Sequence, residues 1–143
     1  MSTRSLIRFA TREEGVSFSE HRKRVEVQVY KHYDGYPEGH PVNLARFLNE
    51  FEIVNGTPFE DDSRVANGLG CLAAQYIAAF KMKPGDIYVE NPDTQHGDIE
   101  YITYVWGIEN KNIWMSIFDT YKDKCIFVGK PQELIDKYEY DEN

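Results

Sequence analysis

The sequence contains few of the residues and motifs that would identify a reaction. Only 2 of its 143 residues are cysteine, and because no Cys-x-x-Cys pair or clustered Cys/His spacing occurs, no zinc or redox motif is indicated. Cys71 falls in an apolar helical pattern and Cys125 in an expected strand, which predicts two buried thiols in a reducing compartment. No serine has a Gly-x-Ser-x-Gly context, and Gly68-Leu69-Gly70 lacks the spacing and the Lys-Ser/Thr pair of a phosphate loop.

Positive charge and long apolar runs are also scarce. The 16 Lys and Arg residues against 24 Asp and Glu give a formal charge of −8, which disfavours duplex nucleic acid as a partner because phosphate neutralisation supplies most of that affinity. No window approaches the ~20 apolar residues of a membrane span, and the N-terminus has no signal-peptide run. We therefore expect a cytoplasmic protein with no membrane partner, folded as a single domain over residues 1–143.

The hydrophobic pattern predicts an α+β fold. Two alternating strands, 4–9 and 24–30, flank a polar connection and should pair antiparallel, with Arg4, Leu6 and Arg8 on one face of the first. Two helices follow, one from Pro41 to about 55 and one with a core stripe from Val65 to Phe80 that Asp61-Asp62-Ser63 should cap. Later segments predict strands at 87–89, 99–106, 113–119 and 125–128, and a terminal helix from about 130. We expect a mainly antiparallel sheet with two central helices packed on one face and a short C-terminal helix.

The stretch from Tyr30 to His40 concentrates aromatic rings, imidazoles, carboxylates and glycines between a predicted strand and a predicted helix. Such side chains usually need burial or partners, so their concentration points to a site or to a shaped turn. Strand alternation places Tyr30 and His32 on the same face.

Three interpretations of this stretch remain open. In the first, His32, Asp34 and His40 hold a metal, with His96 and Asp98 as further ligands, and the chain is a metal-dependent phosphodiesterase. In the second, rings stack on a base while guanidinium groups hold phosphate, and the candidate ligand-binding residues are Arg4, Arg8, Tyr30, His32, Asp34, Tyr36, Asn91 and Thr94. In the third, the tyrosines pack over the sheet edge, Asp34 and Pro37 shape the turn, and the aromatic sheet face binds a protein. We favour the second, with no catalytic residue, metal or cofactor assigned.

Some of these residues carry a resemblance. Thr3-Arg4-Ser5 at the N-terminus and the motif His32-x-Asp34-Gly35-Tyr36-Pro37-x-Gly39 resemble a group of small phage-encoded and bacterial proteins, in which Trp usually stands at the position of Tyr33. Leu72-Ala73-Ala74-Gln75 and Asp98-x-Glu100-Tyr101 are also similar, and the matching stretches cover about half of the chain. The segment Thr11 to Lys23 is longer than the hairpin expected in that group.

This resemblance implies a function. The group is connected with phage sponge proteins that sequester cyclic or glycocyclic nucleotide immune signals and so inhibit Thoeris or CBASS defence in the host cytoplasm. It implies an α+β fold, nucleotide pockets at subunit interfaces and a homo-oligomer, and it carries over Arg4, His32, Asp34 and Tyr36 as candidate pocket or pocket-shaping residues. A small-residue line of Gly70, Ala74 and Ala78 and the aromatic strand faces are the surfaces expected to associate.

Overall fold

The computed structural model describes residues 3–11, 25–49, 51–54, 65–107 and 113–139. Eight strands and three helices occur within these ranges, in the order β1 (Ser5–Thr11), β2 (Val25–Lys31), α1 (His40–Leu48), β3 (Glu52–Val54), β4 (Val65–Asn67), α2 (Gly68–Phe80), β5 (Ile87–Glu90), β6 (Tyr101–Gly107), β7 (Trp114–Asp119), β8 (Lys124–Gly129) and α3 (Pro131–Tyr138). The α+β class is therefore confirmed.

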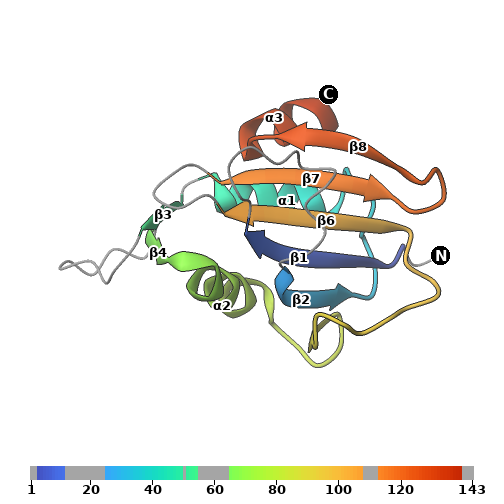
Figure 1. The fold of residues 1–143 in the computed structure, drawn as a ribbon, viewed down its shortest axis with the longest axis horizontal. Coiled ribbons are helices and arrows are strands. Elements are labelled where there is room, and N and C mark those ends of the chain that lie inside the picture. The colour runs from blue at the N-terminus through green and yellow to red at the C-terminus, as the bar shows by residue number, and fades with distance from the viewer. Residues whose placement is uncertain (1–2, 12–24, 50, 55–64, 108–112, 140–143) are drawn as a thin grey trace.

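Six of the strands form one sheet in the order β5-β2-β1-β6-β7-β8. The expected antiparallel pairing of β1 with β2 is confirmed, and β6, β7 and β8 form a second antiparallel run. The two runs join through a parallel pairing of β1 with β6, which was not predicted. Figure 1 shows α1 behind β6 and β7, and none of the helices in the described ranges covers the other face of the sheet; we call this second face the open face.

Strand alternation sorts the side chains between the two faces as the sequence predicted. Ile7, Phe9 and Val29 are fully buried under the helices, and the Phe9 ring lies 5.7 Å from that of Tyr76 in α2. On β6 the sequence left the inward face undecided. Val105 is in the core, so alternate residues of β6 face outward beside Arg8.

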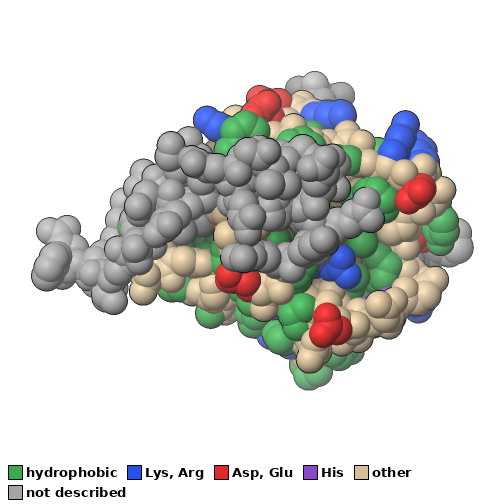
Figure 2. All heavy atoms as spheres, in the orientation of Figure 1, with side chains coloured by type: hydrophobic (Ala, Val, Ile, Leu, Met, Phe, Trp, Pro, Cys, Tyr) green, Lys and Arg blue, Asp and Glu red, His purple; other side chains and the backbone are tan. Residues whose placement is uncertain are grey.

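Acidic and basic side chains both occur on the visible side of the molecule. Figure 2 shows basic side chains mainly along its upper and right edge, with acidic side chains among them and below. The net charge of −8 therefore does not make the visible part of this side uniformly acidic, and an anion site there depends on individual residues.

Several predicted boundaries were wrong. Helix α1 ends at Leu48 rather than near residue 55, because Glu52–Val54 pairs with Val65–Asn67 as a small parallel sheet. That pairing also takes Val65 out of α2, which begins at Gly68. The predicted capping segment 61–63, the insertion 12–23 and the turn 109–112 lie outside the described residues.

The prediction of two buried thiols was also wrong. Cys125 is exposed on the edge strand β8 and Cys71 is half-buried, and both are free. Across the described ranges, no helix combines the length and the apolar character needed to cross a membrane.

The surroundings of Gly39 and Gly70 predict that replacement by alanine changes stability in opposite directions. A Cβ at Gly39 would lie 2.5 Å from the backbone oxygen of Asp34, whereas a Cβ at Gly70 in α2 would meet nothing within 4 Å. Gly39→Ala should lower the free energy of unfolding by ~1–3 kcal/mol, because backbone must shift. Gly70→Ala should raise it by up to ~1 kcal/mol through helix propensity. Urea denaturation of both variants checks the signs, and equal effects would contradict the packing of the 34–39 turn.

Candidate functional site

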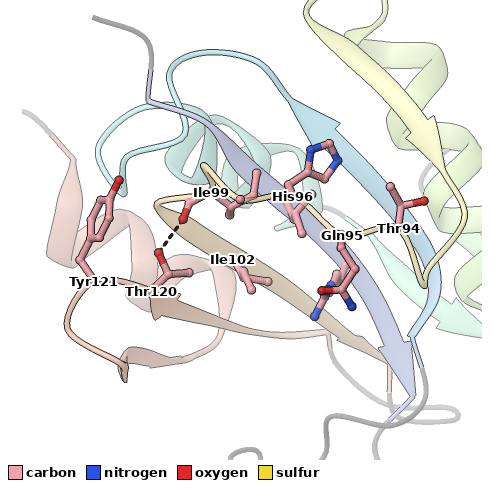
Figure 3. A pocket seen from close by; sticks show the side chains of 10 residues that line it. Thr94, Gln95, His96, Ile99, Ile102, Thr120 and Tyr121 are labelled. Carbon is pink, nitrogen blue, oxygen red and sulfur yellow. Dashed lines mark hydrogen bonds between the residues drawn. The ribbon is translucent and has the colours of Figure 1, made fainter.

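A groove of about 410 Å³ opens on the open face of the sheet. Its floor is Leu6 and Arg8 of β1 with Ile102 of β6, and Leu6 and Ile102 are direct neighbours in the parallel register. The segment 94–99 forms one wall, and the residues after β7 form the other. The lining residues are Leu6, Arg8, Thr94, Gln95, His96, Gly97, Ile99, Ile102, Thr120 and Tyr121. A cavity of this size is typical of small-molecule sites, and Figure 3 shows how its side chains are arranged.

Arg8 is the cationic residue of the groove, and its guanidinium is held in place by neutral groups. Its Nε donates to Oε1 of Gln28 at 2.9 Å, and one terminal nitrogen donates to the hydroxyl of Tyr104 at 3.1 Å. The ion pairs found among the described residues do not include Arg8. Within the described ranges, its guanidinium is therefore oriented by hydrogen bonds to neutral groups, and no carboxylate there forms an ion pair with it.

Gln28 connects this arginine to the groove wall. Although it belongs to the open face, its side chain is fully buried, and its amide donates to Glu90 at 3.0 Å and to the carbonyl of Thr94 at 3.2 Å. Glu90 in turn accepts from His96 at 2.6 Å. A buried amide with all of these partners fixes the geometry around it, because leaving any of them unpaired would cost free energy.

The groove wall formed by residues 94–99 also has contacts at its C-terminal end. Asp98 forms an ion pair with Arg4, and the backbone N–H of Glu100 donates to the Arg4 carbonyl at 2.9 Å. Arg4 therefore holds the groove wall in place and is not among the groove-lining residues. Its role as a ligand contact stays a prediction.

Tyr30 and His32 lie beside the groove and contact each other as alternation predicted. The Tyr30 hydroxyl and Nδ1 of His32 are 2.9 Å apart. The Tyr30 ring stacks on His96 with centroids 4.7 Å apart and planes at 8°, and burial raises the pKa of Tyr30. One face of the Tyr30 ring is therefore already covered by the wall, and Tyr30 supports His96 instead of lining the cavity.

The other predicted residues divide between the wall and a separate turn. Thr94 lines the groove, while Asn91 uses its side chain to accept the Asp93 N–H at 2.9 Å, which closes the turn before the wall. Asp34 is exposed with φ 59°, and its carbonyl accepts from the His40 N–H at 2.7 Å. The Tyr36 carbonyl accepts from Gly39 at 2.9 Å. Asp34 and Tyr36 therefore shape the entry to α1, and neither lines the groove.

The structure does not assemble the metal site that His32, Asp34 and His40 suggested. His40 is buried, and its Nε2 lies 2.6 Å from the Tyr76 hydroxyl in α2, whereas His32 bonds Tyr30 on the open face. Within the described part of the chain, no three His, Cys, Asp or Glu side chains converge as metal ligands. The hypothesis of a phosphodiesterase built on these three residues is not supported by their placement.

Several groove residues were missed at the sequence level. Alternation placed Gln28 on the outward face of its strand and left the face of Tyr104 open. Nothing local showed that Tyr104 would meet Arg8, because that contact depends on the β1–β6 register. Gln95, Thr120 and Tyr121 lie in turns without a motif. Only the concentration of turn formers in 91–98 marked that segment as a shaped loop.

His40 predicts a pH dependence of stability. Burial lowers its pKa from 6.5 to about 3, so the unfolded chain binds this proton more readily. The contribution of neutral His40 to the free energy of unfolding is fully present above pH 6.5. This free energy falls by up to ~1.4 kcal/mol per pH unit as the pH drops from 6.5 toward 3. His40→Gln keeps a hydrogen-bonding group without titrating. The difference in unfolding free energy between wild type and variant should change over this pH range, and a constant difference would show that His40 is not held neutral.

Comparisons of the chain with protein-family models, curated proteins and solved structures gave no significant match.

Proposed function

We propose that this chain is a non-catalytic binding protein for a small nucleotide, which it holds in the groove on the open face of the sheet. The specific role proposed is that of a phage protein that sequesters a cyclic or glycocyclic nucleotide immune signal in the host cytoplasm. The groove supports the binding part of this proposal. The immune-evasion part rests on the resemblance carried by residues 32–39.

The observation that carries the proposal is the placement of Arg8. A guanidinium held by two neutral partners keeps its charge and part of its donor edge for a ligand. It lies on the floor of a groove whose other floor residues, Leu6 and Ile102, are apolar. A site with one cation and an apolar bed fits a molecule that combines phosphate with a flat ring.

A small ligand also agrees better with the charge of the chain than a polymer does. With a formal charge of −8, the whole molecule repels a long polyanion, whose binding needs many phosphate contacts. One or two phosphates need only the local field of Arg8, because charges more than about 8–10 Å away are largely screened at physiological salt.

Binding and release of an intact ligand form the first test. The full chain is incubated with a panel of cyclic dinucleotides and glycocyclic ADP-ribose, and the shift in melting temperature is recorded. A ligand at about 100 times its dissociation constant should add ~2.7 kcal/mol to stability. Bound ligand is then recovered by heat denaturation and identified by mass, and we expect it unchanged.

A matched pair of arginine variants locates the site. Arg8→Gln should weaken nucleotide binding by about tenfold or more, because a charge-assisted hydrogen bond is lost. Arg46 lies in α1, outside the groove lining, and forms an ion pair with Glu139. The control variant Arg46→Gln should therefore bind nucleotide as wild type does. A cleaved product would show catalysis, and no thermal shift with any nucleotide would favour the open face as a protein-binding surface.

Self-association stays a prediction that belongs to this proposal. Gly70, Ala74 and Ala78 are all exposed on α2, and the helix carries no charged residue over its 13 positions. Two acidic chains could meet there without facing like charges, and small side chains permit close approach of two helices. Ala74→Glu should therefore reduce the mass measured in solution by light scattering to that of one chain, while Ala74→Ser leaves it unchanged. A wild type that is already monomeric at micromolar concentration would contradict the prediction.

A further inference from the structure

The groove has two unlike ends. The floor residues Leu6 and Ile102 are paired in register, and Arg8 lies two positions further along β1. Thr120 and Tyr121 follow β7, where the Thr120 N–H donates to the Glu100 carbonyl just before β6 begins. Figure 3 shows Tyr121 and Thr120 on one side of Ile102, with Gln95 and Thr94 on the other.

At the end of the groove near Thr120, the one donor of the threonine hydroxyl is already in use. The Thr120 hydroxyl lies 2.6 Å from the Ile99 carbonyl and 3.0 Å from that of Glu100. Ile99 itself is buried. The remaining side chain at this end is Tyr121, which is 76% exposed, so its ring has free surface. This end offers an apolar bed and an aromatic ring, which suit a flat, weakly polar group.

The end at Arg8 has the opposite character. The guanidinium is fixed by Gln28 and Tyr104, and Gln95 stands exposed on the wall beside it. A fixed guanidinium and an exposed side-chain amide, for which no partner is found among the described residues, are donors for an anion.

We infer that the groove binds one nucleotide unit in a fixed direction, with phosphate at Arg8 and Gln95 and the base against Tyr121. This inference rests on the proposed function and adds to it the ligand's orientation and the residue that selects for a base. Tyr121 acts as the base platform, and a sugar phosphate without a base occupies only the Arg8 end.

The test separates the two ends with fragments. Adenosine 5′-monophosphate, adenosine and ribose 5-phosphate are titrated into wild type, Arg8→Gln and Tyr121→Ala, and binding is followed by NMR chemical shifts. Arg8→Gln should weaken the monophosphate and ribose 5-phosphate at least ~10-fold and leave adenosine unchanged. Tyr121→Ala should weaken the monophosphate and adenosine ~5-fold or more and leave ribose 5-phosphate unchanged.

A control variant and the contrary outcomes separate the fixed orientation of the ligand from nucleotide binding itself. Tyr88→Ala removes another exposed tyrosine, on β5 and outside the groove lining, and should bind all three fragments as wild type does. If both groove variants weaken every fragment equally, or if a cyclic dinucleotide binds while no fragment does, the fixed orientation is wrong and the proposed function stands. If wild type binds neither fragments nor the cyclic panel, the proposed function fails and the orientation fails with it.

Discussion

The parallel pairing of β1 with β6 is the constraint on which the rest of the structure depends. It joins an N-terminal hairpin to a C-terminal antiparallel run and places Arg8 beside Tyr104, 96 positions away in the chain. A parallel pair needs a long crossover connection, and the segment between the two strands supplies it with α1 and α2. The helix layer and the groove floor are therefore two consequences of the same connection.

The contacts around the groove show how individual charges are paired in an acidic chain. The carboxylates nearest the groove already have cationic or donor partners, because Asp98 binds Arg4 and Glu90 accepts from His96 and Gln28. Arg8 is left with neutral partners. Net charge describes the behaviour of the molecule at long range, whereas the field inside a cleft is set by which charges remain unpaired there.

The sequence was sufficient for features that depend on local periodicity. Alternation assigned the faces of β1 and β2 and placed Tyr30 beside His32, and helical spacing found the buried stripe that includes Leu72 and Tyr76. It was not sufficient where long-range pairing decides. The end of α1 depends on the pairing of β3 with β4, and no residue near 49–55 signals that competition. The Tyr30–His40 stretch attracted attention through composition, yet residues 34–40 close the turn into α1 through their backbone groups, because a tight turn and a ligand site favour the same residue types.

The buried amide of Gln28 shows what the site is arranged to preserve. A carboxylate at this position would satisfy the Arg8 guanidinium more strongly, but it would cancel the charge of Arg8 and would meet Glu90 as a like charge. A hydrophobic side chain would remove one hydrogen-bond partner from each of Arg8, Glu90 and the Thr94 carbonyl, which costs free energy at partly buried groups. The neutral amide of Gln28 accepts a hydrogen bond from Arg8 and donates to Glu90 and the Thr94 carbonyl, so it orients the guanidinium without placing a negative charge beside it. Immobilising the cation before a ligand arrives lowers the entropy cost of binding, and this is the property that a protein needs if its role is to hold a scarce small anion without changing it.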